Sequence, residues 1–275
     1  MEAEEQKSTT QGKKLIILGF VTIGILFFMY GRYQDPELFT PSALDTIQRI
    51  AYGFYIILIV SFGAIAFGMY RYHREKVENK GKDLSSIIAL TTWNSKSRKI
   101  FVATFIGYGV FFSLVSGTLV YQPEVSFSYH YGATIPSGFV APCCDEPGYM
   151  PQVIIYLTDH VGLNIIPINL VLQIIVSYLV GLNAAIAVNA YTISKKGRGA
   201  SSIGAIAGLF IACPTCAGSF LSVFIGTASG IALSIALTQL QTFFIAISIP
   251  ILLVTPYIMA KKLQNTDGSC KVNPD

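Results

Sequence analysis

Long apolar runs alternate along the chain with shorter polar stretches. A helix of about 20 apolar residues crosses the ~30 Å hydrocarbon core of a bilayer. Six runs approach or exceed that length, at residues 15–30, 50–70, 100–121, 164–193, 203–225 and 241–260. The pattern predicts an all-α fold, a polytopic bundle of six transmembrane helices that forms a single membrane domain over residues 1–275.

Composition supports a membrane protein. Of 275 residues, 52% are hydrophobic and 12% are charged, and the mean hydropathy is +0.57. A soluble globular domain carries about 25% charged residues. The apolar content also excludes a disordered chain.

The placement of Lys and Arg predicts the orientation in the membrane. Short loops rich in these residues stay on the cytoplasmic side. With both termini and the basic loop 71–99 inside, Arg32 and Arg49 are the only ones of the 19 basic residues left outside. We therefore expect a multi-pass plasma-membrane protein with cytoplasmic N- and C-termini and one large external loop, residues 122–163, between helices 3 and 4.

The two long loops differ in character. The external loop holds no Lys or Arg, and its Tyr, Pro and Gly content predicts turns and extended segments, with a short strand or an interfacial helix at 153–157. The inner segment 76–99 is basic and amphipathic. Two explanations stay open: a helix that lies on the membrane surface, or basic residues that are present only because short cytoplasmic loops are rich in Lys and Arg. The lipid bilayer is thus the expected partner, nucleic acid is not, and other membrane subunits or a homo-oligomer stay open.

Paired cysteines are the strongest chemical feature. Cys213 and Cys216 flank Pro214 in the fifth run, and Cys143 and Cys144 are adjacent in the external loop. Cysteines three apart share a helix face, and proline opens the helix. In hydrocarbon, such a break is tolerated where protein surrounds it. We therefore expect Cys213 and Cys216 to face the bundle interior.

Small and amide residues predict which helices pack there. Gly204 and Gly208 let a neighbouring helix approach closely. Asn169, Gln173 and Asn183 fall on one face of the fourth run and predict a seam against the fifth. A plainer alternative treats the amides as contacts between helices and the cysteines as small apolar residues.

The external cysteine pair is poorly suited to a structural disulfide. Adjacent Cα atoms lie 3.80 Å apart, below the usual 4.4–6.8 Å, so that bond is strained and easily reduced. Metal ligation or thiol exchange fits better. His130 and His160 of the same loop are candidate additional ligands, although no standard zinc spacing is present.

Several common activities lack their sequence motifs. Phosphate-binding loops, dinucleotide-binding loops, zincin motifs and nucleophile elbows are absent, and no span contains an acidic or basic residue. No catalytic residue is predicted, and whether the protein is an enzyme stays open.

The segment from Gly204 through Cys213-Pro214-Thr215-Cys216-Ala217-Gly218-Ser219 to Pro250 resembles uncharacterised polytopic membrane proteins of prokaryotes, archaea above all, with a C-P-T-C-A-G core. This resemblance implies no particular activity. The Cys-Pro element is more distantly similar to the Cys-Pro-Cys of copper-transporting P-type ATPases, whose ATPase domains are missing. The arrangement of cysteines is also similar to the vitamin K epoxide reductase and disulfide-bond-oxidising families, whose loop cysteines are not adjacent.

Three functions follow from these observations. The first is soft-metal handling, with copper as the possible cofactor, because thiolates select Cu(I). The second is a thiol-disulfide relay between the outer and inner pairs. The third is a structural or assembly subunit without chemistry of its own. Burial disfavours the thiolate that exchange requires, so metal handling ranks first.

Overall fold

The computed structural model is mostly helical and contains one small antiparallel sheet. The chain divides into two compact units, residues 1–78 with 110–174, and residues 79–109 with 175–275. Helices α4 and α6 each contribute residues to both units. The structure describes residues 2–32, 44–78, 85–86, 88–89, 94–142, 148–194, 249–250 and 252–258.

Helices cover most of the described residues. Three contain segments long and apolar enough to cross a membrane, Gln11–Gly31, Asp45–Glu78 and Pro167–Val188. This confirms helices at the first, second and fourth predicted runs. The fifth run lies outside the described residues, and residues 249–250 and 252–258 of the sixth are helical. The helices are α1 (Glu2–Gly31), α2 (Leu44–Glu78), α4 (Ser95–Val115), α5 (Phe127–Tyr131) and α6 (Pro167–Ser194).

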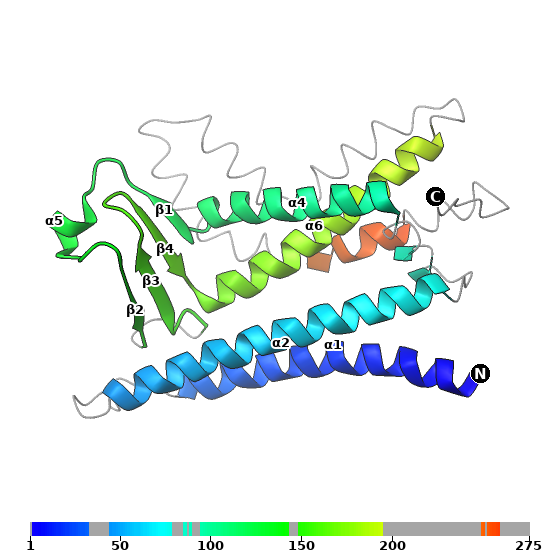
Figure 1. Cartoon of the computed structure of the whole chain (residues 1–275), viewed down its shortest axis with the longest axis horizontal. Coiled ribbons are helices and arrows are strands. Elements are labelled where there is room, and N and C mark those ends of the chain that lie inside the picture. Colours follow the sequence, from blue (N-terminus) through cyan, green and yellow to red (C-terminus); the bar gives the residue numbers. More distant parts are fainter. Residues whose placement is uncertain are drawn as a thin grey trace. The chain divides into compact units, whose positions relative to one another are not determined.

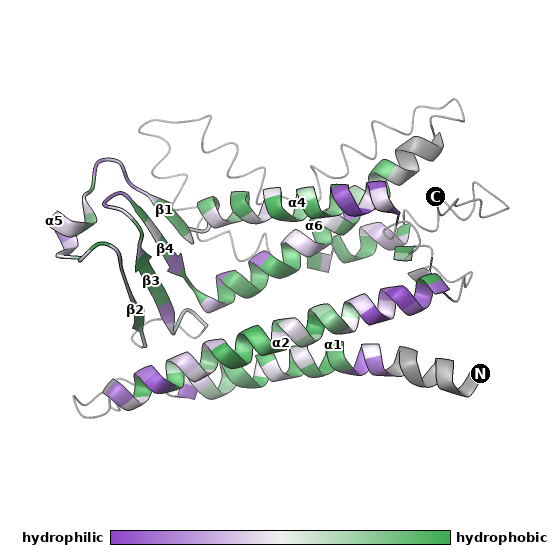
Figure 2. Ribbon diagram, in the orientation of Figure 1, coloured by the Kyte–Doolittle hydropathy of each residue, from purple (hydrophilic) through white to green (hydrophobic). Residues whose placement is uncertain are grey.

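Helices α1 and α2 form a closely packed antiparallel pair (Figure 1). Glycines allow the approach, since a Cβ built on Gly68 would lie 3.0 Å from the carbonyl oxygen of Gly12, and one on Gly12 would lie 3.2 Å from that of Gly68. Their central turns are apolar and their ends more polar (Figure 2). Small residues thus play the role expected between helices that lack a hydrophobic driving force in lipid.

The sheet is formed by the predicted external loop, 122–163, and the residues directly before and after it. Its strands are β1 (Leu119–Tyr121), β2 (Ser137–Ala141), β3 (Gln152–Tyr156) and β4 (Val161–Ile165). All neighbours are antiparallel in the order β1-β4-β3-β2. The extended segments are confirmed. Of the two alternatives predicted at 153–157, the structure has the strand, β3, and the all-α prediction is wrong for this part of the chain.

Two predicted span boundaries are also corrected. The third span was expected over 100–121, but α4 ends at Val115, Gly117 adopts a positive φ of 71°, and β1 follows. The fourth was expected from residue 164, but Asn164 lies in β4 and its backbone N–H donates to the carbonyl of Thr118, at 2.8 Å. Helix α6 begins instead at Pro167, where the fixed φ of proline favours a first turn. Hydropathy alone does not separate apolar strand residues from the helix beside them.

In the second unit, the C-terminal half of α6 supplies the core. Val176, Leu179 and Val180 pack with Leu252, and Tyr108 and Tyr178 cover this cluster. Gly181 faces Phe101 of α4, whose carbonyl oxygen would lie 3.1 Å from an added Cβ. Close packing around α6 explains why this helix is more buried than α1 or α2.

Candidate functional site

A tyrosine at the end of α1 holds the chain just after β2. The hydroxyl of Tyr30 donates to the carbonyl of Pro142, at 2.7 Å. Tyr30 also packs edge-on against Phe54 of α2, with ring centroids 5.1 Å apart. Both rings are buried. The segment that leaves β2 is therefore tied to the end of the helix pair.

A second tyrosine, on α2, holds the sheet at two points. The hydroxyl of Tyr55 lies 2.6 Å from the carbonyl oxygen of Pro151 and 3.0 Å from that of Ile165. One hydroxyl carries one proton, so the two carbonyls share it. Pro151 precedes β3 and Ile165 ends β4, so a single side chain joins both strands to α2.

The first turn of α6 makes the third attachment. The backbone N–H of Ile168 donates to the carbonyl of Gly148, at 3.1 Å. This satisfies one of the N–H groups that a helix start leaves without an internal partner. Gly148 has a φ of 93°, which favours glycine, and it lies beside Phe27. Gly148, the first described residue after segment 143–147, is thus fixed to α6.

These attachments bracket the external cysteine pair. Cys143 and Cys144 lie outside the described residues, in the segment 143–147, but Pro142 precedes that segment and Gly148 follows it. Both flanking residues bond to helices that can span a membrane. The candidate site is therefore the end of α1, α2 and α6 that contacts the sheet. The predicted inner residues Cys213, Cys216, Pro214, Gly204 and Gly208 lie outside the described part of the chain.

The two candidate histidine ligands lie around one stretch of backbone. The Nδ1 atom of His160 is 3.2 Å from the carbonyl oxygen of Gln122 and 3.1 Å from that of Val125, and Nδ1 of His130 is 3.3 Å from that of Ser126. Since a carbonyl only accepts, Nδ1 is the donor in each contact, and Nε2 is the nitrogen that could bind a metal ion in the neutral ring. Metal-binding histidines commonly have this arrangement. Within the described ranges, however, no three His, Cys, Asp or Glu residues lie close enough to hold a metal ion.

A polar cluster at α5 was not predicted from sequence. The carboxylate of Asp159 accepts hydrogen bonds from the hydroxyls of Ser128 and of Ser126, the latter at 3.1 Å. The Ser128 bond is the main reason that the pKa of Asp159 lies below its ordinary value. The backbone carbonyl of Asp159 also accepts from the N–H of Phe127, at 2.9 Å. These bonds fasten α5 to the turn between β3 and β4.

Acid should weaken this attachment. A carboxyl whose folded pKa is lowered stabilises the folded state above its unfolded pKa of about 3.9, and that stabilisation is lost as pH falls through the folded value. We expect Asp159→Asn to lower the unfolding temperature slightly at pH 7. The difference from the native chain should shrink below about pH 4. Thermal unfolding in detergent from pH 7 to pH 3 measures this, with Glu124→Gln as a control that removes a loop carboxylate outside the cluster. A difference independent of pH would contradict the assignment.

The amide residues of the predicted seam contact different helices. In the first unit, the Gln173 amide donates to the hydroxyl of Ser113 on α4, at 2.6 Å. In the second, the Asn183 amide donates to the carbonyls of Leu179 and Leu252, at 2.8 and 3.0 Å. Asn169 lies half-buried in the first turn of α6. Gln173 and Asn183 thus contact helices other than the fifth run, and the predicted seam against the fifth run falls outside the described residues.

Sequence reasoning missed the two tyrosine anchors. Tyrosine is enriched where helices meet the membrane interface, so the position of Tyr30 at the end of the first apolar run was a usable indication. Tyr55 lies further inside its run, and nothing in the sequence connects it to residues 151 and 165. Comparison with family models, curated proteins and solved structures finds no match to this chain. Function must therefore be argued from the residues themselves.

Proposed function

We propose that this protein is a multi-pass plasma-membrane protein that binds a soft metal ion, with copper(I) favoured, through paired thiols. Cys143 and Cys144 receive the ion on the outer side, and Cys213 and Cys216 bind it within the membrane. The proposal includes six spans with both termini cytoplasmic and other membrane subunits or a second copy as possible partners.

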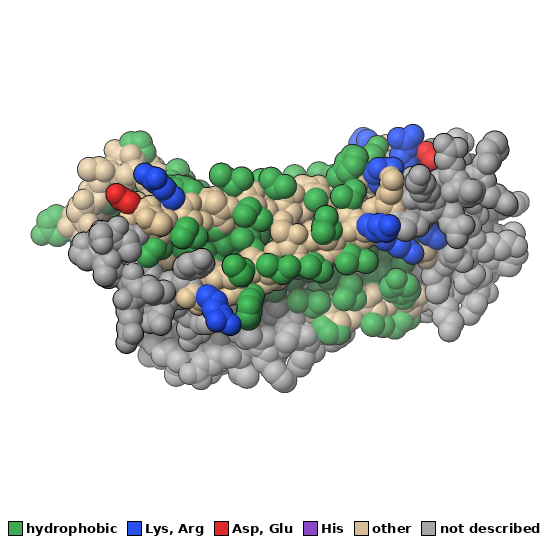
Figure 3. All heavy atoms as spheres, turned by 90° about the horizontal axis from the view of Figure 1, so that it is seen from below, with side chains coloured by type: hydrophobic (Ala, Val, Ile, Leu, Met, Phe, Trp, Pro, Cys, Tyr) green, Lys and Arg blue, Asp and Glu red, His purple; other side chains and the backbone are tan. Residues whose placement is uncertain are grey.

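The charge distribution supports the orientation. Because α1 and α2 are antiparallel, Lys13 and Lys14 lie at the same end of the pair as Arg71, Arg74 and Lys76. Figure 3 shows most of the basic side chains of this face at one end, fewer at the other end, and apolar side chains over its middle. The sheet contacts the opposite end through Tyr30 and Tyr55. The positive-inside rule assigns the basic end to the cytoplasm and the sheet to the outer side.

The observation that carries the metal proposal is the pair of attachments around the outer thiols. Pro142 is bonded to α1 and Gly148 to α6, so the five residues between them start and finish at held positions. A binding segment with held ends has less conformational freedom to lose when a ligand orders it. Support of this kind favours a ligand-binding role over a loop that only connects two strands.

The chemistry of the residues favours copper(I) among metals. Thiolate is a soft ligand, and each thiol releases a proton when it binds the ion. The bound cation offsets the cost of placing charged sulfur at Cys213 and Cys216 in a low-dielectric site. His130 and His160 are candidate additional ligands through Nε2.

Metal content tests the proposal. Protein purified from copper-supplemented cells under reducing, anaerobic conditions should retain near-stoichiometric copper by elemental analysis. Cys143→Ser with Cys144→Ser should remove most of the copper, because the ion is no longer captured on the outer side. Cys213→Ser with Cys216→Ser should also remove most of it, because the binding site within the membrane is lost. Cys270→Ser, in the polar tail, is the matched control and should keep full loading.

Other outcomes would overturn this function in favour of a named alternative. Metal content near zero, with thiol labelling of Cys213 and Cys216 that changes with quinone or reductant, would favour the disulfide relay. Metal content and labelling that stay unchanged in every variant, in a protein that purifies only with other subunits, would favour an assembly role.

A further inference from the structure

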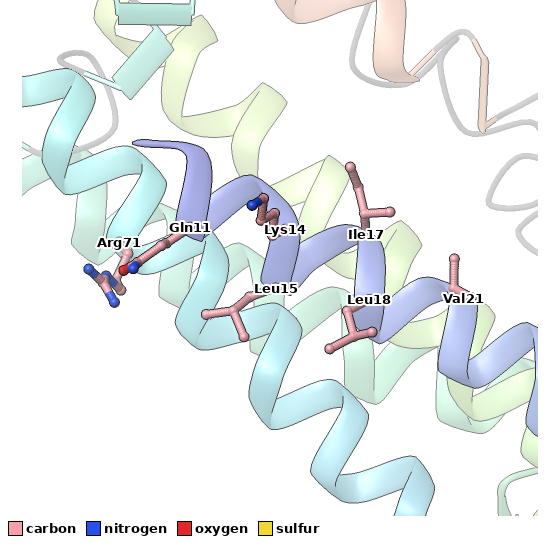
Figure 4. A pocket seen from close by; sticks show the side chains of 7 residues that line it. All are labelled: Gln11, Lys14, Leu15, Ile17, Leu18, Val21 and Arg71. Atoms are coloured by element: carbon pink, nitrogen blue, oxygen red, sulfur yellow. The ribbon is translucent and has the colours of Figure 1, made fainter. Parts of the chain in front are cut away.

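A groove on the basic end of the helix pair lies outside the proposed thiol site. It has a volume of about 550 Å³. Six of its seven lining residues lie on α1 and one on α2 (Figure 4): Gln11, Lys14, Leu15, Ile17, Leu18, Val21 and Arg71. The groove is open, since Ile17, Leu18 and Val21 are each more than half exposed, so it can cover one side of a long molecule without enclosing it.

Its lining changes from polar to apolar along α1. Gln11 and Lys14 precede Leu15, Leu18 and Val21, and the spacings of three and four residues keep these side chains on one side of the helix. Arg71 of α2 lies near the polar end, beside Gln11 (Figure 4). The apolar part is open, since Leu18 is 61% exposed and Val21 51% exposed.

The charges at the polar end select an anion. Lys14 and Arg71 supply two positive charges from two different helices, and the Gln11 amide supplies neutral donors. Arginine suits phosphate because its planar group donates two parallel hydrogen bonds, and lysine binds phosphate as a point charge. Arg71 also lies over the Phe67 ring, 5.9 Å from the ring centroid. A purely apolar occupant would add no interaction with the two positive charges, while a free phosphate would leave the apolar wall uncovered.

We infer that this groove binds one anionic glycerophospholipid. Its phosphate lies between Lys14 and Arg71, and an acyl chain follows Leu15, Leu18 and Val21. Such a lipid covers both parts of the lining at once. The groove lies at the end of α1 and α2 assigned above to the cytoplasm, so the lipid belongs to the inner leaflet. The site itself requires only that these helices lie in a membrane, and it is independent of the metal proposal.

Binding of defined lipids to the full chain tests the inference. Purified protein in neutral detergent is titrated with phosphatidylglycerol, or with phosphatidylcholine of the same acyl chains, and bound lipid is counted by native mass spectrometry. One phosphatidylglycerol should bind about tenfold or more tightly than phosphatidylcholine. The double change Lys14→Gln with Arg71→Gln should weaken phosphatidylglycerol about ten- to thirtyfold, since each basic residue near anionic lipid contributes about 1 kcal/mol.

The matched control removes the same charge from the same two helices. Lys13→Gln with Arg74→Gln alters residues outside the groove, Lys13 lying over the Tyr72 ring and Arg74 bonded to Glu78. This variant should keep selective binding. Leu18→Trp fills the apolar part without changing charge and should also weaken binding, which keeps the test valid if the charge variant fails to fold.

Three results would overturn the inference. Equal weakening by the two double changes would indicate a general surface charge effect. Equal affinity for the two lipids would mean that the groove does not prefer a net negative headgroup, since both lipids carry a phosphate and only phosphatidylglycerol has a net charge. A second copy of the chain that occupies the groove would be revealed by a dimer that Leu18→Trp converts to a monomer while lipid binding stays unchanged.

Discussion

Replacing Gly68 by valine is expected to separate α1 from α2. The first added carbon would lie 3.0 Å from the carbonyl oxygen of Gly12 and 3.1 Å from Cβ of Leu15. Neither atom belongs to the flexible end of a side chain, so the helices themselves must move apart. Overpacking of this kind costs about 1–3 kcal/mol.

The loss extends beyond the substituted position. Gly12 and Gly19 also face α2, and the carbonyl oxygen of Ser61 would lie 3.1 Å from a Cβ on Gly19. Displacing α2 at Gly68 therefore also breaks the close contacts that α1 and α2 make at Gly12 and Gly19. Unfolding in mixed micelles with a rising fraction of SDS, followed by circular dichroism, should show a midpoint well below that of the native chain.

Gly63→Val is the matched control, on the same helix. A Cβ at Gly63 meets no heavy atom within 4 Å, so this change alters helix propensity without closing on α1. Its midpoint should stay near the native one. Equal loss in both variants would mean that valine weakens α2 itself, and the close approach of the two helices would not be the cause.

Replacing Tyr55 by phenylalanine is expected to loosen the sheet from the helix pair. The change keeps the ring and deletes the hydroxyl whose proton the carbonyls of Pro151 and Ile165 share. Pro151 is fully buried, so its carbonyl loses a partner where water does not readily replace it. Leaving a buried polar group without its hydrogen bond costs about 1–3 kcal/mol.

Hydrogen exchange measured by mass spectrometry locates the effect. Amides of β3 and β4 should exchange faster in the variant, because the hydroxyl holds the start of one strand and the end of the other. Amides in the middle of α1 should keep their native rates, since the Phe54 aromatic contacts remain. Faster exchange throughout the chain would point to global unfolding and would contradict a local anchor.

Tyr52→Phe provides the comparison for this test. Tyr52 lies one turn before Tyr55 on α2, and its ring is 54% exposed. Loss of its hydroxyl removes no bond to the sheet, so exchange in β3 and β4 should not change. The contrast between the two variants isolates the Tyr55 hydroxyl from the general effect of a more apolar α2.

The sequence by itself predicted the features that depend on local pattern. The apolar runs at 15–30 and 50–70 became α1 and α2, and the run at 164–193 became most of α6. The turn-forming residues of the external loop predicted extended structure. Lys and Arg positions predicted one basic end for the helix pair. Each of these properties is read from neighbouring residues, because helix length and hydropathy depend on the segment alone.

Tertiary structure alone decided how these parts join. The pairing of β1 with β4, the shared proton of Tyr55 and the Gly148 carbonyl at α6 each connect residues distant in sequence. The apolar residues 119–121 are compatible with a helix or a strand, and the pairing of Leu119 with Leu163 between β1 and β4 decides for the strand. The anchors around the outer cysteines and the mixed lining of the lipid groove arise in the same way. Single hydrogen bonds and close contacts depend on which segments lie next to each other in space, and hydropathy does not predict which segments those are.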